Sequence, residues 1–142
     1  MEQGITVDID APPGRVWDVL TDIDRWSEWT DSVTSARRLD QGQLRAGSRA
    51  ELAQPKIPKG VWTVTMVEPG LSFNWEQTGP GVRTTARHRL EALPDGGTRV
   101  HLAVEQAGWL GVTVGRFYRK LTDRYLAMES AGLKARSESS TD

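Results

Sequence analysis

His88 is the residue of this chain whose type and position most suggest chemistry. It lies in the segment VRTTARHRLE, where strand alternation places it on one face with Val82, Thr84, Ala86 and Leu90. A neutral imidazole among such neighbours can orient a ligand carbonyl or hydroxyl, or relay a proton. The alternative is a structural histidine satisfied by one hydrogen-bond partner, since no carboxylate nearby in the sequence completes a dyad or triad.

Tyr125 and the pair Trp26 and Trp29 are further candidates. Tyr125 falls on the apolar side of a predicted helix, so its hydroxyl could polarise a carbonyl in the same space. The alternative is packing, with the hydroxyl bonded to water or to a backbone carbonyl. Trp26 and Trp29 lie three residues apart and share one face of a short predicted helix. They either cover the mouth of a cavity or close the end of the core.

Large apolar side chains are expected to line the same space. Strand alternation directs Phe73 and Trp75 of LSFNWEQ and Leu102 of TRVHLAVEQ to the inner face. In VWTVTMV both faces contain apolar residues, and Trp62 is assigned inward because a tryptophan is costly to expose. The predicted ligand-binding set is Trp26, Trp29, Trp62, Phe73, Trp75, His88, Leu102, Phe117, Leu121 and Tyr125.

Composition excludes several classes of function. The 142 residues carry a formal charge of −1, which argues against nucleic-acid binding, because phosphate contacts need a concentrated Lys/Arg surface. The chain has no cysteine and two histidines, which excludes disulfides and thiolate chemistry and makes a metal site unexpected. No P-loop, HExxH or EF-hand pattern is present, so no cofactor is expected. Four arginines, Arg83, Arg87, Arg89 and Arg99, alternate outward and predict a solvated face, not a phosphate site.

The N-terminal stretch MEQGITVDID has neither the basic nor the apolar character of a signal peptide. No window approaches the ~18 apolar residues that a membrane span requires. The expectation is therefore a cytoplasmic protein without integral membrane association. A homodimer is compatible with the sequence, which does not decide the oligomeric state.

The elements that must position these residues follow in a simple order. Ile5, Val7 and Ile9 alternate with polar residues and predict a first strand, after which a proline pair begins a helix that runs to about Asp22. A second short helix, IDRWSEW, follows. Six further strands are predicted at residues 33–39, 48–54, 61–67, 71–77, 82–93 and 98–106. The short links between them contain Gly and Pro and indicate antiparallel hairpins.

A long amphipathic helix is predicted over residues 112–136. Gly132 falls on its apolar arc, where a mid-helix glycine costs ~1 kcal/mol relative to alanine, so another backbone is expected to approach closely there. Leu126 and Leu133 fall on the far side and have no evident partner. The apolar arc, which needs an equally long surface to cover it, consists of Leu110, Val114, Phe117, Leu121, Tyr125 and Met128.

The predicted fold is α+β, with a curved antiparallel sheet of about seven strands wrapped around the long C-terminal helix and two short helices after the first strand. Because these helices cannot fill the whole concave face, an internal pocket is expected between sheet and helix. Residues 1–136 are predicted to form one domain, and the polar residues 137–142 a flexible tail.

Four segments carry a family resemblance: APPGRVWDVLTDIDRWSEWTDSV, QPKIPKGVWTVTMVEPGLSFNWE, HRLEALPDGGTRVHL and ESAGLKAR. In this order, over nearly the whole chain, they resemble the START-related polyketide cyclase/dehydrase and lipid-transport superfamily (SRPBCC). The resemblance implies the helix-grip fold, also seen in the birch-pollen allergen, with an internal cavity. It does not single out an activity, because members include aromatase/cyclases, sterol and quinone carriers, plant hormone receptors and partners of other proteins.

Three functions follow from these observations. The leading hypothesis is a carrier or sensor that binds a small hydrophobic molecule, lipid-, polyketide- or quinone-like, between the sheet and the C-terminal helix. The alternative is a polyketide cyclase or dehydratase in which His88 is the general acid/base and Tyr125 polarises a carbonyl; no inward arginine is found beside them, only Gln106. The third is a module that binds another protein through an exposed apolar patch, involving Trp109, Leu126 or Leu133.

Overall fold

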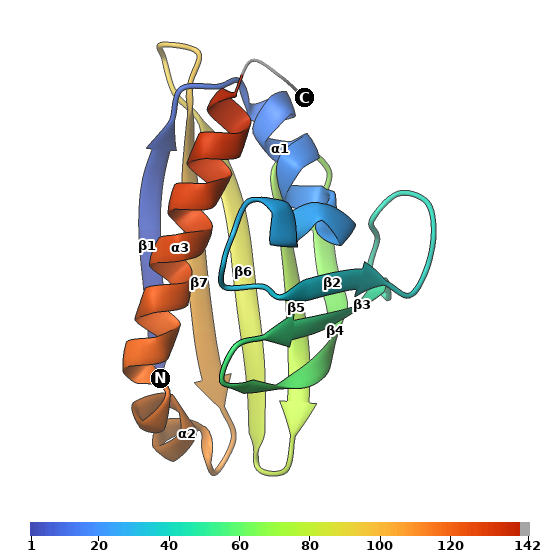
Figure 1. Ribbon diagram of the computed structural model, residues 1–142, viewed down its shortest axis with the longest axis vertical. Coiled ribbons are helices and arrows are strands. Elements are labelled where there is room, and N and C mark those ends of the chain that lie inside the picture. Colours follow the sequence, from blue (N-terminus) through green and yellow to red (C-terminus); the bar gives the residue numbers. More distant parts are fainter. Residues whose placement is uncertain (140–142) are drawn as a thin grey trace.

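One curved antiparallel sheet forms the body of the structure (Figure 1). The computed structural model describes residues 1–139, and within them seven strands lie in the order β1-β7-β6-β5-β4-β3-β2. The first strand therefore pairs with the last, and every other neighbour is a hairpin partner. The strands are β1 (Glu2–Ile9), β2 (Ser35–Arg38), β3 (Arg49–Gln54), β4 (Ile57–Glu68), β5 (Ser72–Gly79), β6 (Val82–Ala92) and β7 (Thr98–Ala107).

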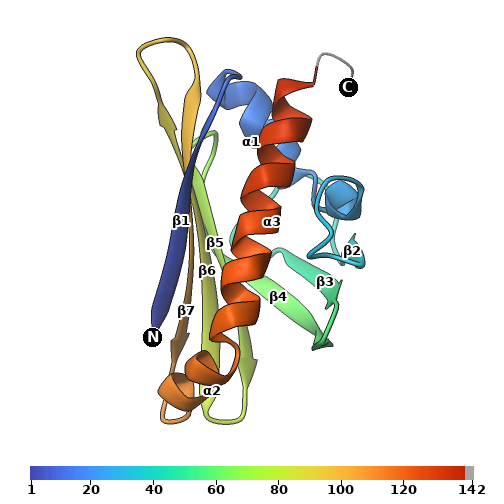
Figure 2. The same ribbon diagram turned by 60° about the vertical axis from the view of Figure 1, so that its left-hand side comes forward.

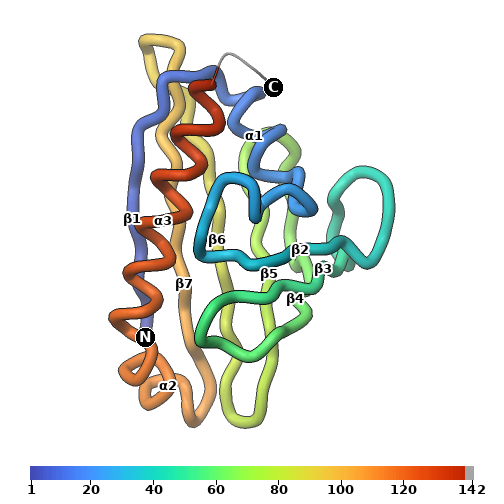
Figure 3. The backbone as a smooth tube through the Cα atoms, viewed as in Figure 1, coloured from blue at the N-terminus to red at the C-terminus, as the bar shows by residue number. Residues whose placement is uncertain are grey.

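The helices cover the concave side of this sheet. They are α1 (Pro13–Thr21), the 3-10 helix η1 (Ile23–Glu28), α2 (Gly111–Phe117) and α3 (Arg119–Glu138). Figure 2 shows α3 running along the sheet, with β2, β3 and part of β4 curling round it toward η1. The backbone trace in Figure 3 shows the same path, with the C-terminal helix beside the N-terminal strand. The predicted sheet wrapped around a C-terminal helix is confirmed. Among the described helices, none combines the length and apolar character needed to cross a membrane.

Strand alternation predicts the two faces of the sheet correctly. Phe73, Trp75, His88 and Leu102 are each at most 3 % exposed, and Trp62 is also buried, as its size predicts. The opposite face carries charged cross-strand pairs. These join Arg87 to Glu105 at 3.0 Å and Arg99 to Asp8 at 2.8 Å, so the arginines form the expected solvated face.

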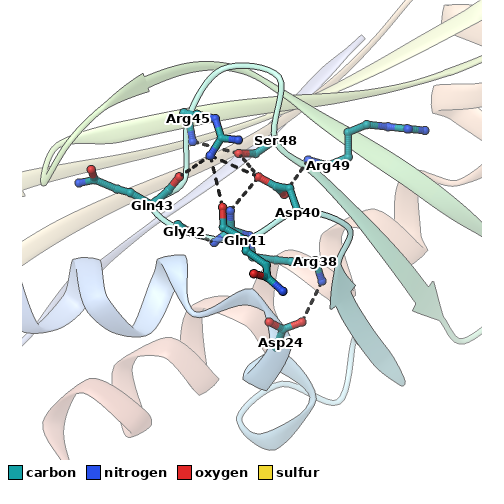
Figure 4. Close-up of polar contacts among 9 residues, drawn as sticks. All are labelled: Asp24, Arg38, Asp40, Gln41, Gly42, Gln43, Arg45, Ser48 and Arg49. Carbon is teal, nitrogen blue, oxygen red and sulfur yellow. Dashed lines mark hydrogen bonds and ion pairs between the residues drawn. The ribbon is translucent and has the colours of Figure 1, made fainter.

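Asp40 orders the loop between β2 and β3 (Figure 4). Its carboxylate accepts hydrogen bonds from Ser48 Oγ at 2.9 Å, from Arg38 Nη2 at 3.1 Å and from the Arg49 backbone N–H at 3.3 Å. Burial raises the pKa of Asp40, but these hydrogen bonds outweigh it and hold the pKa below its usual value. The Arg38 backbone N–H in turn donates to Asp24 at 2.8 Å, which holds β2 against η1.

The C-terminal helix is not the single continuous helix that the sequence predicted. It is broken at Tyr118, whose φ of −97° and ψ of 7° separate α2 from α3. Gly111 and Gly115 weaken the helical preference of α2, and both lie close to Gln106 at the end of β7, where a Cβ would be crowded. Figure 2 shows α2 set at an angle to α3, beside the lower ends of the strands.

The buried side of α3 was also predicted wrongly. Leu126 and Leu133, expected on the far side, are 4 % and 0 % exposed, whereas Phe117 is 80 % exposed. The break at Tyr118 accounts for Phe117, which precedes it. Within the unbroken helix α3, the buried face is centred on Leu126 and Leu133 and is turned away from the predicted arc. Leu126 and Leu133 therefore belong to the core and cannot form a surface patch. Helix α3 also extends to Glu138, two residues past its predicted end, while residues 140–142 of the predicted tail lie outside the described residues.

The predicted close approach at Gly132 is confirmed. A Cβ built on Gly132 would overlap the backbone carbonyl of Trp29, the residue that follows η1. Since Leu133 packs in the core beside it, α3 is contacted on two sides, by the sheet and by the segment after η1. The glycine lets the two backbones come this close.

Replacing Gly132 with alanine is expected to lower the free energy of unfolding by about 1–2 kcal/mol in urea titrations. Overpacking typically costs ~1–3 kcal/mol, and here the obstacle is backbone rather than a flexible side chain. The better helix propensity of alanine offsets only ~1 kcal/mol of this overpacking cost. Gly14→Ala in α1 is the control, because nothing lies within 4 Å of the added Cβ, and it should be neutral or stabilising. Equal stability of Gly132→Ala and the parent would contradict the observed packing.

Candidate functional site

A cavity of about 290 Å³ lies between the concave face of the sheet and the C-terminal helices. Strands β3 to β7 form one wall, and η1, α2 and α3 contribute the other. The volume is close to the lower end of the range for small-molecule sites. Pro58, near the start of β4, and Thr78, near the end of β5, line the edge of the cavity and are exposed to solvent. The cavity therefore reaches the surface there.

Five of the ten predicted ligand-binding residues line this cavity: Trp26, Trp62, Trp75, His88 and Tyr125. Their side chains come from five different elements, η1, β4, β5, β6 and α3, and from both walls. The structure therefore brings half of the predicted set to one place, while the binding role of each residue stays a prediction.

The other five lie elsewhere. Phe73 and Leu102 are fully buried behind the cavity wall, and Leu121 is half-buried outside it. Trp29 packs on Trp26, with ring centroids 5.8 Å apart, and faces a smaller hollow between α1 and α3. Phe117 points to solvent because of the break in the helix.

Aromatic rings make up a large part of the wall. Trp75 is central, with its ring centroid 5.2 Å from that of Trp26 and 5.6 Å from that of Trp62. The indole N–H of Trp26 donates to the carbonyl of Leu20 at 3.0 Å, which satisfies its polar atom and fixes the ring. Tilted rings at these distances pack favourably and present flat apolar surfaces to a ligand.

His88 is held as a neutral ring with a defined tautomer. Its imidazole stacks on Phe73 with centroids 4.1 Å apart, and its Nδ1–H donates to the Phe73 carbonyl at 3.1 Å. Nε2 therefore carries the lone pair. Burial lowers the pKa of His88 to about 4, although the hydrogen bond to Phe73 opposes this. At neutral pH the residue is an uncharged acceptor that faces the cavity.

Glu129 on α3 is the partner that the sequence did not reveal. Its Oε1 lies 3.8 Å from Nε2 of His88, and its side chain is only 16 % exposed. Burial raises the pKa of Glu129 to about 7, so both protonation states are populated near neutral pH. No carboxylate nearby in the sequence pairs with His88, but the fold brings one from a distant segment beside it. With the correct helix phase, the position of Glu129 between Leu126 and Leu133 would have pointed it inward.

The His88–Glu129 pair can bind or move a proton. A separation of 3.8 Å is too long for a direct hydrogen bond, so each group keeps an open position toward the cavity. Protonated Glu129 can donate to a ligand oxygen, and His88 Nε2 can accept from a ligand hydroxyl. Groups whose pKa values are displaced by burial and that meet in a cleft are typical of functional sites.

Tyr125 is less available than predicted. Its hydroxyl donates to the backbone carbonyl of Pro55, which ties α3 to the turn between β3 and β4. It would have to give up this bond to polarise a ligand carbonyl. Gln106, by contrast, has a buried side-chain oxygen that no residue among 1–139 satisfies. Within the same range, no group of three His, Cys, Asp or Glu side chains could hold a metal ion.

Comparison with known proteins assigns the family. The model described as polyketide cyclase / dehydrase and lipid transport matches residues 5–138. The chain belongs to this family. No match to a curated protein sequence was found. Membership agrees with the observed sheet and cavity, and the family spans both binding and catalytic activities.

Solved structures similar to this polyketide cyclase/dehydrase and lipid-transport family member have the same fold. The ZhuI aromatase/cyclase from Streptomyces sp. R1128 gives a TM-score of 0.78 at 18 % identity, over 97 % of this chain and 93 % of that one. A START superfamily protein from Mycobacterium smegmatis gives 0.77 at 15 % identity, over 96 % and 97 %. Ara h 8.0201 gives 0.67 at 11 % identity, over 95 % and 98 %. These likenesses show the helix-grip fold alone.

The pKa of Glu129 predicts a pH-dependent stability. Folding raises it from 4.5 to about 7, so the stability linked to its proton is fully present below pH 4.5 and is lost as the pH rises through 7. Glu129→Gln stays neutral at every pH. Relative to wild type, this variant should gain up to about 3 kcal/mol between pH 4.5 and pH 8, at ~1.4 kcal/mol per pK unit.

Chemical denaturation at several pH values measures this difference. His88, whose pKa is lowered, makes an opposing contribution in both proteins. Glu68→Gln, at an exposed position, is the matched control. A constant difference between wild type and Glu129→Gln across this range would mean that the carboxyl is not buried in the folded protein.

Proposed function

We propose that the protein binds a small, mostly apolar molecule that carries a hydroxyl or carbonyl group, and that it acts as a carrier or sensor for this molecule. The observation that supports this most is the cavity of about 290 Å³, whose aromatic walls surround the His88–Glu129 pair. Ligand sites typically combine an apolar lining with a few polar groups that set orientation.

The polar pair gives the site its selectivity. Burying a ligand hydroxyl without a partner costs ~1–3 kcal/mol, so a purely polar ligand is rejected by the walls. A purely apolar ligand, in turn, would leave His88 Nε2 and the Glu129 carboxyl without partners in a water-poor space. The favoured ligand therefore places one oxygen near this pair and flat apolar rings or chains against Trp62 and Trp75.

Filling the cavity should abolish binding. Thr84 lines the cavity on β6, and its neighbour Thr85 points to the opposite face of the sheet. Thr84→Trp is expected to weaken the binding of Nile red, measured by fluorescence, by more than about tenfold, because an indole occupies much of the space. Thr85→Trp adds the same side chain outside the cavity and should bind the dye as wild type does.

Native mass spectrometry of freshly purified protein completes the test, since any co-purifying molecule appears as added mass. If both tryptophan variants bind Nile red equally well, the dye does not enter this cavity. Wild-type protein that binds neither dye nor any co-purified molecule would overturn the proposal.

An enzyme of polyketide cyclase or dehydratase type is the second candidate. The observation that favours it is again the His88–Glu129 pair, and one similar structure is titled an aromatase/cyclase. His88 Nε2 could remove a proton from a carbon next to a carbonyl, while protonated Glu129 donates its proton to the carbonyl oxygen to give an enol. Glu129 then takes the donor role first considered for Tyr125, whose hydroxyl is engaged with Pro55.

Proton exchange tests this chemistry without the natural substrate. Wild-type protein is expected to accelerate deuterium incorporation next to the carbonyl of a β-keto thioester, followed by NMR in D₂O. His88→Asn and Glu129→Gln should each slow the accelerated rate by about 10²- to 10⁴-fold, the usual contribution of a positioned acid or base. Thr85→Trp is the control for the fold. No acceleration by wild type, with dye binding intact, would leave the protein a binder only.

A further inference from the structure

The end of the molecule formed by α2 carries an exposed apolar surface, here called the α2 tip and consisting of Trp109, Val112 and Phe117. Their exposed fractions are 83 %, 54 % and 80 %. Among the described residues, five large hydrophobic side chains are exposed, and the tip holds three of them, including both aromatic ones. Figure 1 shows α2 at the lower end of the molecule, beyond the first turn of α3.

The segment that carries this tip is positively charged. Residues 108–124 contain four basic side chains and a single acidic one, a local charge of +3 in a chain of net −1. Arg116, Arg119 and Lys120 are exposed, and none of them forms an ion pair within residues 1–139. The one acid, Asp123, accepts a hydrogen bond from Gln3 at 2.7 Å. The cations are therefore free to meet an anionic surface.

We propose that the α2 tip docks on an anionic lipid surface. Tryptophan is enriched at membrane–water interfaces, and exposed aromatic side chains bordered by Lys and Arg are typical of segments that lie in the interfacial layer. Each cation near an anionic leaflet adds to the attraction. Trp109 and Phe117 would enter the headgroup region while Arg116, Arg119 and Lys120 face the lipid phosphates.

Other occupants fit this surface less well. A second copy joined through the same tip about a two-fold axis would bring one +3 region against another, which is electrostatically unfavourable. A stable protein interface uses about 20–30 residues on each side, whereas the tip offers three apolar side chains on and beside a seven-residue helix. A lipid surface needs no matching partner shape.

Docking in this way would also place the cavity near the membrane. Val114 of α2 and Tyr118, which follows α2, line the cavity, while Trp109 and Phe117 of the same segment are exposed to solvent. An apolar molecule dissolved in the bilayer would then have a short path to the cavity. The docking surface goes beyond the proposed function and does not depend on which molecule the cavity binds.

Vesicle co-sedimentation tests the proposal on the full chain. Wild-type protein should pellet with vesicles of phosphatidylcholine and phosphatidylglycerol at 3:1, and much less with phosphatidylcholine alone. The double variant Trp109→Ala/Phe117→Ala should lower partitioning by more than about tenfold, because each ring can bury roughly 150–250 Å². Arg116→Glu/Lys120→Glu should lower it by at least about 25-fold, at about fivefold for each cation lost.

Matched variants remote from the tip control for composition and charge. Leu39→Ala/Leu71→Ala removes two other exposed apolar side chains, and Arg25→Glu/Arg37→Glu makes the same change of charge elsewhere. Both should pellet as wild type does. Nile red binding without vesicles, measured on every variant, reports the fold and the cavity separately, so docking and ligand binding can fail independently.

Three results would overturn the proposal. The first is wild-type protein that shows no preference for anionic vesicles. The second is a tip variant that pellets as well as wild type. The third is a dimer in sedimentation velocity that the tip variants dissociate, which would assign the surface to a second copy of the chain. If the aromatic double variant fails to fold, the charge-reversal pair, at exposed positions, decides alone.

Discussion

The contact between Gly132 of α3 and the backbone carbonyl of Trp29 sets the position of the C-terminal helix, and the rest of the site depends on that position. A side chain larger than hydrogen there would push α3 away from the segment that follows η1. With the glycine in place, Leu133 packs completely in the core and Glu129, one turn earlier, comes over His88. A backbone contact outside the cavity thus determines which polar groups meet within it.

Burying His88 and Glu129 beside each other lowers the stability of the folded protein. Burial raises the pKa of Glu129 to about 7 and lowers that of His88 to about 4, so folding disfavours the charged form of each. A salt bridge would require both to be charged in a space that solvates neither well. The pair is held instead as two weakly satisfied neutral groups or as one buried anion. A core optimised for stability alone would place apolar side chains here, which is why the pair points to function.

The face of the sheet on which each strand residue lies was predicted well, because side chains alternate every two residues and the pattern is local. Alternation over seven to ten residues placed His88 and Trp75 on the inner face, and each assignment needed only its own strand. Helix phase is different, because an error accumulates along the chain. A single non-helical residue, Tyr118, separates Phe117 from α3, and within α3 the arc drawn through Leu121 and Tyr125 left Leu126 on the wrong side. Glu129 was missed because the phase assigned to α3 was wrong. Its partner His88 also belongs to a distant strand, so no local pattern in the sequence joins the two residues.

The break at Tyr118 also explains why the molecule has both a cavity and an exposed tip. Near α1 the concave face is filled by side chains such as Val16, Leu20 and Val100, each at most 1 % exposed. A continuous helix with the predicted phase would have brought Phe117 to the opposite end in the same way. The turn at Tyr118 and the close seating of Gly111 on the backbone at the end of β7 instead leave this ring in solvent. The space between α3 and the sheet then stays open as the cavity, and the apolar ring of Phe117 stays exposed at the surface. One local departure from helical geometry therefore accounts for the cavity and the surface beside it.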